Sequence, residues 1–324
     1  MPKTTVVIPN YNGIKYLDAC LASLYKGTLI PKVILVDNGS WDGSRELAEE
    51  RYPAVKVITF SENKGFSCAV NAGIRESDTE YVLLLNNDTV ADASMVEELE
   101  RSLDQCSDAF SAAAKMVDLN APDKLDGAGD FYCALGWAFA RGKDKPVDAY
   151  DKPGRIFSAC AGAAIYRRNL FERVGLFDEG HFAYLEDVDL GYRANIYGFQ
   201  NLYEPKAVVY HAGSGFSGSR HNEFKVSLSS RNSVYLVYKN MPILQLLINL
   251  PFLIVGYAVK FLFFCIKGLG GVYFKGLMDG VKLSLSIDGR RNKVRFSGKN
   301  IKSYLWVQGQ LWGSLIRLIC SIFR

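Results

Sequence analysis

The chain has 324 residues, of which 49% are hydrophobic and 22% are charged, a composition that fits a globular protein and not a disordered chain. Its net charge is +4, but residues 241–324 carry twelve Lys or Arg side chains against Asp279 and Asp288. This segment is therefore at +10 and residues 1–240 are at −6, which indicates a basic appendage with a membrane or a nucleic acid as its partner.

Seven cysteines are scattered along the chain without a C-x-x-C pair, and none of the three histidines has zinc-site spacing to another His or a Cys. We therefore expect reduced, mostly buried thiols in a cytoplasmic protein. The N-terminal sequence MPKTTVVIPNYNG has no apolar signal-peptide core before its first strand-like run, which predicts that the protein is not exported.

Strand-like and helix-like patterns alternate over the first 85 residues. Apolar or β-branched runs predict strands, and apolar positions at helical spacing, such as Leu17, Leu21 and Leu24, predict helices. This alternation predicts βαβ crossovers and a largely parallel sheet. The predicted strands are 4–8, 33–36, 55–60 and 81–85, and the predicted helices are 14–24, 42–51 and 63–74.

Polar clusters follow three of these strands. Because the carboxyl ends of parallel strands meet at one edge of a sheet, the clusters would form a nucleotide-sized site there. The alternative for each cluster alone is a set of turn hydrogen bonds or a helix cap. The chain has neither G-x-G-x-x-G after its first strand nor G-x-x-x-x-G-K-[ST], which argues against a dinucleotide-binding fold and a P-loop enzyme. The clusters are Asn10 to Asn12, Asp37 to Ser40 and Asn86 to Asp88.

Eight segments, in their order and spacing, resemble the family 2 glycosyltransferases of GT-A fold. The resemblance implies an α/β catalytic domain, residues 1–240, with a mostly parallel central sheet flanked by helices. Within it, FDE…YLEDVDLGYR is most similar to the rhamnosyltransferase branch, whose members use a nucleoside-diphosphate sugar to extend a lipid-linked or cell-surface glycan. The segments are VVIPNYNG (6–13), ILVDNGSWDGS (34–44), NKGFSCAVNAGI (63–74), LLLNNDTV (83–90), ACAGAAIYRR (159–168), VGLFDEGHFAYLEDVDLGYR (174–193), VVYHAGSGFS (208–217) and SRN (230–232).

Such a reaction needs a seat for the nucleobase. The resemblance makes Asp37 the hydrogen-bonding partner of the base, because an ionised Asp only accepts and so suits a pyrimidine imide N–H. Core packing is the alternative for Phe66, and Arg231 either reaches the diphosphate or braces the active-site loop. The resemblance assigns nucleotide-sugar binding to Pro9, Asn10, Tyr11, Asp37, Asn63, Gly65, Phe66, Asn87 and Arg231.

The diphosphate leaving group needs neutralisation. Asp88 matches the last acidic position of the family's metal motif, although the motif reads Asn-Asn-Asp and lacks the first carboxylate of the usual D-x-D. One carboxylate with the substrate phosphates still suits Mg²⁺ or Mn²⁺, since magnesium keeps most of its waters. His211 matches a family position that completes the coordination, and a structural role is its alternative.

The acceptor hydroxyl needs a base. The resemblance assigns this role to Asp187, with Glu186 supporting it or contacting the acceptor, and predicts a single displacement that inverts the anomeric configuration. Helix capping is the alternative for either carboxylate. Asp189 and Arg193, four residues apart, are expected to form a helix-stabilising pair.

The glycine-rich and aromatic segment 126–145 is expected to form loops. The resemblance places it near the acceptor side, where loops vary most. Trp137 and Arg141 are its candidate acceptor contacts.

The C-terminal appendage predicts association with a membrane. Residues 243–266 form an apolar run with Lys260 as its only charge, and Gln245, Asn249 and Pro251 interrupt it. These interruptions favour a bent helix or a hairpin in the membrane interface over a spanning helix, and the basic tract that follows would attract anionic lipid. The tract comprises Lys267, Lys275, Lys282, Arg290, Arg291, Lys293, Arg295, Lys299 and Lys302.

A second interfacial helix is expected within residues 304–324, and the alternative for the appendage is a buried helix with a solvated basic tail. Residues 241–324 thus predict a protein on the cytoplasmic face of the cell membrane, peripheral or monotopic, with a single spanning helix as the alternative. A nucleic-acid partner is not expected, because the basic residues lie beside the apolar run.

The predicted function is metal-dependent, inverting transfer of a sugar, L-rhamnose from dTDP-rhamnose, to a glycan or lipid-linked saccharide acceptor in cell-surface polysaccharide synthesis. One alternative is another donor, carrying galactofuranose, a hexose or an amino sugar. The other is a non-catalytic nucleotide-sugar-binding assembly subunit. A sugar nucleotidyltransferase is disfavoured, because residues 9–13 carry no Lys or Arg.

Overall fold

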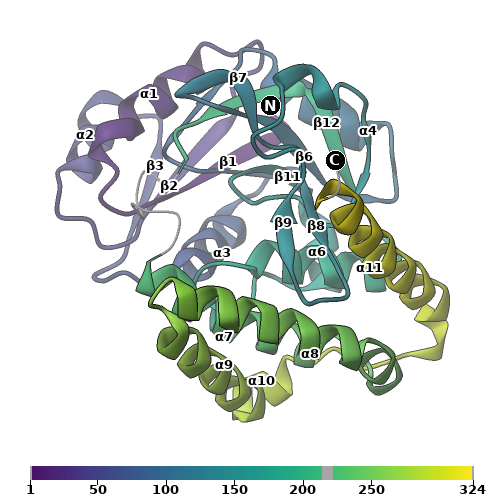
Figure 1. Ribbon diagram of the computed structural model, residues 1–324. Helices are drawn as coiled ribbons and strands as arrows, with labels where there is room; N and C mark the ends of the chain where they lie inside the picture. The colour runs from purple at the N-terminus through teal and green to yellow at the C-terminus, as the bar shows by residue number, and fades with distance from the viewer. Residues whose placement is uncertain (1, 214–221, 323–324) are drawn as a thin grey trace.

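The computed structural model describes residues 2–213 and 222–322, and a mixed β-sheet is formed by strands within residues 4–211 (Figure 1). Its main strands lie in the order β10-β12-β6-β11-β4-β1-β2-β3. Every strand and helix predicted for the first 85 residues is present close to its predicted bounds. The strands are β1 (Thr4–Asn10), β2 (Lys32–Asp37), β3 (Lys56–Thr59), β4 (Tyr81–Leu85), β6 (Ala109–Asp118), β10 (Gly154–Ile156), β11 (Ala163–Arg167) and β12 (Gln200–His211).

The sheet is less parallel than predicted. Strands β1 to β4 pair in parallel, and so do β6 and β12, but β11 lies antiparallel between β4 and β6. The described chain between β6 and β11 has no α-helix to carry it back for a parallel crossover, so β11 enters in the opposite direction. Strands β1, β2, β4, β6 and β12 still share one direction, and their carboxyl ends meet at one edge.

Two hydrophobic cores lie on the two faces of this sheet, because side chains alternate along a strand. On β1, Val6 and Ile8 face one core and Val7 faces the other, and all three are fully buried. The first core is covered by α1 (Ile14–Tyr25), α2 (Ser44–Arg51) and α4 (Met95–Asp104). The second is covered by α3 (Phe66–Glu76), α5 (Phe171–Val174) and α6 (Glu186–Ile196). The result is a three-layer α/β arrangement with its ligand edge left open.

Four short strands shape that edge. β5 (Thr89–Ala91) pairs with the end of β12, and β7 (Ala121–Gly127) pairs with the end of β6. A separate hairpin, β8 (Asp130–Tyr132) with β9 (Ala138–Ala140), packs on α6, where the rings of Tyr132 and Tyr192 lie 6.0 Å apart. The segment 126–145, expected to be loops, therefore contains the last two residues of β7 and the whole of this hairpin.

The C-terminal helices lie below the sheet and to its right in Figure 1. They pack on the rest of the chain through a third hydrophobic cluster, in which Tyr192 of α6 meets Leu253, Val307 and Leu311. These helices are α7 (Glu223–Asn240), α8 (Ile243–Ile266), α9 (Gly270–Leu285), α10 (Ile287–Arg291) and α11 (Ile301–Ile322). Helices α7 and α9 approach closely, since a Cβ on Gly276 would lie 1.9 Å from Ser230 Oγ.

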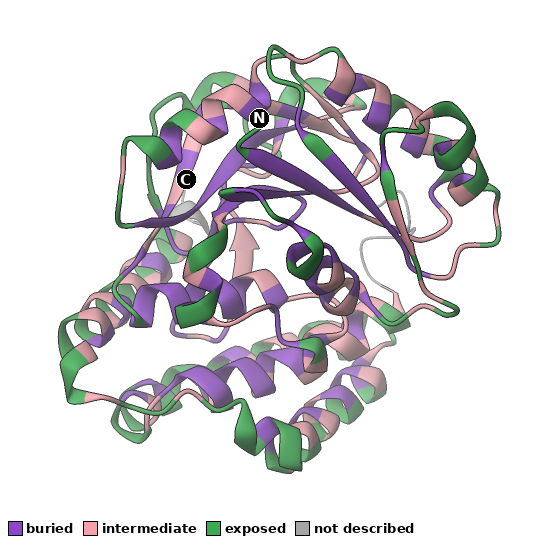
Figure 2. Ribbon diagram, turned by 180° about the vertical axis from the view of Figure 1, so that it is seen from behind, coloured by how far each residue is buried: buried purple, intermediate pink, exposed green. Residues whose placement is uncertain are grey.

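Helix α8 is continuous over 24 residues with Pro251 inside it, so the hairpin expected in this region is wrong. Its polar residues turn inward. Tyr192 Oη donates to Gln245 Oε1 at 2.9 Å, and the amides of Asn249 and Gln308 exchange hydrogen bonds of 2.8 and 2.9 Å. These bonds dock α8 on α6 and α11 and leave its other sides exposed (Figure 2).

Candidate active site

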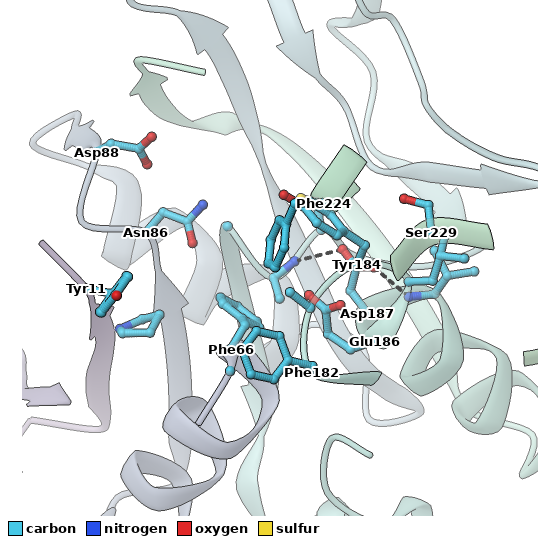
Figure 3. A pocket seen from close by; sticks show the side chains of 18 of the residues that line it. Tyr11, Phe66, Asn86, Asp88, Phe182, Tyr184, Glu186, Asp187, Phe224 and Ser229 are labelled. Atoms are coloured by element: carbon cyan, nitrogen blue, oxygen red, sulfur yellow. Dashed lines mark hydrogen bonds between the residues drawn. The ribbon is translucent and has the colours of Figure 1, made fainter. Parts of the chain in front are cut away.

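A cavity of about 1190 Å³ opens at the shared edge of the sheet. Tyr11, Asn86 and Asp88 lie on one side of it, and Glu186 and Asp187 lie on the other (Figure 3). The strand ends supply the first group and the start of α6 supplies the second. The predicted convergence of the three polar clusters on one edge is thus present, and α6 adds two carboxyl groups.

The ends of β1 and β2 are tied together by amide hydrogen bonds. Asn10 Nδ2 donates to Asp37 Oδ1 at 3.1 Å and to Ser44 Oγ at 2.8 Å, and Asn10 Oδ1 accepts from Asn87 Nδ2 at 2.7 Å. Pro9, Asn10 and Asn87 line the cavity. Asp37 is 1% exposed and is not among the lining residues; its carboxylate accepts from Asn10, and its contact with the base stays a prediction.

The turn before α3 lines the same side of the cavity as the ends of β1 and β2. Asn63, Gly65 and Phe66 line the cavity, and Asn38, from the predicted cluster Asp37 to Ser40, joins them. Asn38 Nδ2 donates to Asn63 Oδ1 at 3.0 Å. Gly65 has φ +87°, and a Cβ there would lie 2.6 Å from the Phe182 ring, so only glycine fits. Phe66 both lines the cavity and packs edge-on against Phe177, so the core-packing alternative also applies.

His211 stands between two carboxylates. Pairing of β12 with β5 sets His211 opposite Thr89, next to Asp88. His211 Nε2 lies 3.1 Å from Asp88 Oδ1, and its Nδ1 lies 2.8 Å from Asp126 Oδ2. Burial opposes a charge on the imidazole, but the hydrogen bonds to Asp126 and Asp88 outweigh it and raise the pKa of His211 to about 9. The sequence did not single out Asp126.

This group fits a divalent cation. A ligating His usually has its second ring nitrogen bound to a carboxylate, which orients the ring, and Asp126 occupies that position here. Asp88 and His211 present one oxygen and one nitrogen to the cavity from adjacent positions. Carboxylate and imidazole are both ligands of Mn²⁺, whereas Mg²⁺ prefers oxygen.

Glu186 and Asp187 begin α6, where their side chains face the cavity. Val188 N donates to Asp187 Oδ1 at 2.7 Å, and Ala161 N donates to Oδ2 at 3.4 Å. Burial nevertheless raises the pKa of Asp187, and burial together with the charge of Asp187 raises the pKa of Glu186 to about 8. Glu186 Oε2 is buried with no hydrogen-bond partner among the described residues. A carboxyl group there is neutral near pH 7 and free to bind a ligand.

The loop before α6 is strained and firmly held. Phe182, Tyr184 and Leu185 have φ of 60°, 71° and 68°, values that non-glycine residues seldom adopt. Asn232 Nδ2 donates to three loop carbonyls at 2.7 to 2.9 Å, and Arg231 Nη2 donates to one of these, His181 O, at 2.8 Å and to Gly180 O at 2.9 Å. Of the two roles expected for Arg231, these bonds support the brace, and the residue does not line the cavity.

A buried ion network fixes α6 on α7. Lys239 Nζ lies 2.6 Å from Asp178 Oδ2 and 2.8 Å from Asp189 Oδ2, and Arg193 Nη2 lies 2.9 Å from the same Asp189 oxygen. Burial alone would raise the pKa of Asp189, but Lys239 and Arg193 outweigh it and hold the pKa well below its usual range. The predicted Asp189–Arg193 pair is therefore present as part of a larger cluster.

Asp130 is a third carboxyl group on the side of the cavity that holds Glu186 and Asp187, here called the acid end. The sequence did not single it out. Asp130 lies at the start of β8, lines the cavity, and is close to Cys160 and Asp187, with potential ligand atoms within 4.8 Å of one another. Burial, with the charge of Asp187, raises the pKa of Asp130, and burial raises that of Cys160. A thiol is a soft ligand that suits a hard cation poorly, so Asp88 and His211 fit Mg²⁺ or Mn²⁺ better than this cluster does.

Trp137 and Arg141, the candidate acceptor contacts, do not line this cavity. Trp137 Nε1 donates to Gly256 O of α8 at 3.1 Å, and the Arg141 guanidinium lies 4.7 Å from the centre of the Tyr150 ring. The sequence motif at 208–217 is described only to Gly213, and its remainder lies outside the described residues.

Known proteins resemble this chain in sequence and in fold. Residues 5–175 match the model of glycosyl transferase family 2. The chain is 27% identical over 262 residues to an N-acetylglucosaminyl-diphospho-decaprenol L-rhamnosyltransferase of Mycobacterium tuberculosis, a match that covers 70% of this chain and 84% of that protein.

Two solved structures share the fold. GalNAc-T7 with UDP, GalNAc and Mn²⁺ has a TM-score of 0.60 at 17% identity, over 74% of this chain and 48% of that one. The mannosyltransferase PcManGT from Pyrobaculum calidifontis with GDP-Man and Mn²⁺ has a TM-score of 0.53 at 16% identity, over 90% of this chain and 82% of that one. The family match and the site together identify the chain as a member of glycosyl transferase family 2, an enzyme that uses a nucleotide-sugar donor and resembles the rhamnosyltransferase branch.

Proposed function

We propose that this enzyme transfers one sugar from a nucleoside diphosphate to a hydroxyl of a lipid-linked saccharide, with a divalent cation and with inversion at the anomeric carbon. The observation that carries the proposal is the division of one cavity into two ends. Asp88 lies at one end, and Glu186 and Asp187 lie at the other (Figure 3). His211 is at the first end, with its Nε2 3.1 Å from Asp88 Oδ1. A donor laid across the cavity would have its diphosphate at the first end and its anomeric carbon towards the second.

The donor nucleotide binds along the strand ends. Tyr11 and Phe66 supply apolar ring surface for the base, and Asn38 and Asn63 supply amide groups beside it. Asp88 and His211 hold the cation, with Asp126 orienting the imidazole. When bound, the cation supplies positive charge to the departing diphosphate. Mg²⁺ and Mn²⁺ are both candidates, and the imidazole ligand favours Mn²⁺.

Asp187 is the general base. Its carboxylate takes the proton from the acceptor hydroxyl while the hydroxyl oxygen forms a bond to the anomeric carbon. The bond from that carbon to the diphosphate oxygen breaks on the opposite face, and the nucleoside diphosphate leaves with the electron pair. Glu186, neutral at pH 7, donates a hydrogen bond to the acceptor from its free Oε2. One displacement inverts the configuration.

L-Rhamnose from dTDP-rhamnose is the proposed donor sugar. Support comes from the relative named as a rhamnosyltransferase, whose acceptor is a saccharide joined through a diphosphate to decaprenol. By that likeness the acceptor here is also a saccharide on a polyprenyl diphosphate, in cell-surface polysaccharide synthesis. Galactofuranose, a hexose or an amino sugar is the alternative cargo, since likeness at 27% identity does not determine the sugar.

The C-terminal helices hold the enzyme on the cytoplasmic face of the membrane. Among the described residues, α8 is the one helix long and apolar enough to cross a bilayer, with a mean hydropathy of 2.0 over its most apolar window. Its polar face is occupied by α6 and α11, and large apolar side chains on its other sides are exposed, which favours a helix lying in the interface. We accordingly divide the chain into a catalytic domain, 1–240, and a membrane-binding region, 241–324.

The test is donor turnover by the purified full chain. A panel of nucleotide sugars, screened with Mn²⁺, Mg²⁺ and EDTA, should reveal one donor that is hydrolysed slowly alone and consumed faster with a saccharide acceptor. The product should have the anomeric configuration opposite to that of the donor by NMR. A retained configuration would reject the single displacement, and donor binding without any turnover would favour a non-catalytic subunit.

A further inference from the structure

A second cavity, of about 610 Å³, lies between the β8–β9 hairpin, the 141–155 segment and α11. Five of its lining residues are cationic and none is acidic. Aromatic side chains, among them Phe131 and Tyr150, complete its walls. The cationic residues are Arg141, Lys143, Lys145, Arg155 and Arg317. Neither the donor site nor the base lies in this cavity, so its charge needs another explanation.

Its three arginines are held by aromatic rings and not by carboxylates. The guanidinium of Arg155 lies 3.4 Å from the centre of the Trp306 ring, and that of Arg317 lies 4.7 Å from the Phe131 ring. Arg141 lies between the rings of Tyr150 and Tyr203, at 4.7 and 5.2 Å. Across the described chain, no carboxylate forms an ion pair with any of these three guanidiniums. Ring stacking fixes their positions but leaves their charge uncompensated.

Cationic side chains held close together repel one another, and a bound anion would relieve this repulsion. Burial lowers the pKa of Arg141, and the nearby charge of Arg317 lowers it further. Lys143 is the exception among the cations, since it pairs with Asp126, the same carboxylate that orients His211. A planar guanidinium offers two parallel N–H donors that match two oxygens of a phosphate. A cavity of this size with several such groups suits a diphosphate better than a single carboxylate.

The position of this cavity connects it to the active site. Phe139 and Ala140 line both cavities. On β8, Asp130 lines the active-site cavity and the next residue, Phe131, lines the basic one, because adjacent side chains of a strand face opposite sides. On α11, Ile316 and Ile319 are 62% and 46% exposed on either side of Arg317. The basic cavity therefore lies between the acid end of the active site and an apolar surface.

We propose that this basic cavity, lined by Arg141, Arg155 and Arg317, binds the diphosphate of a lipid-linked acceptor. The acceptor saccharide then reaches Asp187 past the β8–β9 hairpin, and its lipid chain leaves along α11. This assignment rests on the proposed function, which supplies the lipid-linked acceptor. The donor diphosphate is not the occupant, since its site at Asp88 and His211 lies in the other cavity. The other source of the same chemistry is a phospholipid head group.

A binding experiment tests the cavity without turnover. Farnesyl diphosphate is added to the full chain in detergent with EDTA, which removes the cation from the donor site. Binding measured by calorimetry is then expected at the basic cavity alone. The double variant Arg141→Gln/Arg317→Gln should bind farnesyl diphosphate roughly 10–100-fold more weakly, as expected for the loss of two charge-assisted hydrogen bonds. The control Lys152→Gln/Lys206→Gln removes the same charge from two exposed lysines outside both cavities and should bind like the unaltered protein. Equal binding by the double variant would overturn the proposal.

A kinetic experiment separates the two sources. With a short-chain prenyl-diphosphate saccharide as acceptor, the double variant should show a KM roughly 10–100-fold higher at nearly unchanged kcat. With an alkyl glycoside of the same saccharide, its KM should not change, and its donor hydrolysis and melting temperature should match those of the control. An equal effect on both acceptors, or loss of binding to anionic vesicles in place of the KM effect, would reject the assignment. If the unaltered protein transferred no sugar to either acceptor, the proposed function would fail, and the farnesyl diphosphate result would still decide this site.

Discussion

At the scale of single residues, the two adjacent carboxyl groups at the start of α6 have different environments. Two backbone N–H groups donate to Asp187, which stabilises its ionised form, whereas Glu186 Oε2 has no partner among the described residues. Burial raises the pKa of both. Adjacent groups held in such different surroundings divide naturally into a base and a neutral donor.

Asp187→Asn should therefore lower kcat by roughly 10²–10⁴, the loss typical of a missing general base, while donor binding persists. Glu186→Gln should keep most of its activity at pH 7, because the amide replaces a carboxyl group that is already neutral. Turnover with a saturating acceptor, and donor affinity by calorimetry, would measure both effects. Comparable losses in the two variants would contradict this division.

The pH profile follows from the same group. With the pKa of Glu186 raised to about 8, the unaltered enzyme should lose activity as pH rises through 8, since ionised Glu186 no longer donates to the acceptor. Glu186→Gln does not titrate and should remain active to higher pH. An alkaline limb of the same midpoint in both proteins would assign that limb to another residue.

We infer that Asp126 positions His211 for the proposed metal site. Asp126→Asn keeps the shape of the side chain but removes the charge that orients His211, and should weaken Mn²⁺ binding by roughly 10–100-fold. Electron paramagnetic resonance of free Mn²⁺ in a titration measures this without turnover. Asp123→Asn, on the same strand but without an ion pair among the described residues, is the control. Unchanged Mn²⁺ affinity in Asp126→Asn would remove Asp126 from the site.

Sequence patterns located the ligands that follow strands better than those within loops. Asp88 follows β4, which the apolar pattern predicted, whereas His211, at the end of β12, was identified only through the family resemblance. Asp126 is 85 residues from His211, and only the pairing of β7 with β6 brings the two side chains together. Asp37 was placed on the correct edge, but its burial beneath Asn10 depends on side-chain packing that a single sequence does not encode.

At the scale of elements, α6 is held by its charges. Lys239→Met would leave Asp178 and Asp189 buried without their shared cation and should lower the free energy of unfolding by about 3–5 kcal/mol. The pKa of each carboxyl group is lowered in the folded protein, so their stabilisation is present above pH about 4 and is lost as pH falls. In urea unfolding, the difference in free energy of unfolding between the unaltered protein and Lys239→Met should therefore shrink below that pH. A constant difference at all pH values would point to lost packing instead.

The parallel strands were predictable because their apolar runs are short, uninterrupted and bounded by turn residues, as in β4. The antiparallel direction of β11 could not be predicted. Its sequence is equally apolar, and the direction of a buried strand leaves no periodic signal. For α8, the hairpin alternative to a bent helix was wrong for a different reason. Its polar residues were taken as interruptions, but they are the contacts that dock the helix.

At the scale of the whole molecule, membrane binding should depend on the exposed side of α8. Leu247, Ile254 and Leu262 are 58%, 60% and 61% exposed and are spaced at multiples of two helical turns. Replacing all three with Gln should release the protein from vesicles, since insertion of each such side chain is worth about 1.5–3 kcal/mol. Ile30→Gln, 58% exposed on the catalytic domain, is the matched control. Flotation of the triple variant with the vesicles would contradict the proposed surface.

The docking of α8 on α6 has a geometric consequence for the choice of acceptor. Tyr192, on the helix that begins with the base, is bonded directly to Gln245 on the helix that would rest in the lipid head groups. With no described hinge between them, Asp187 would stand at a set height above the bilayer. The distance from the bilayer to Asp187 would then decide which sugar of a lipid-linked acceptor can reach the base. The enzyme would act on the sugar nearest the lipid and pass over glycans that have already grown beyond that height.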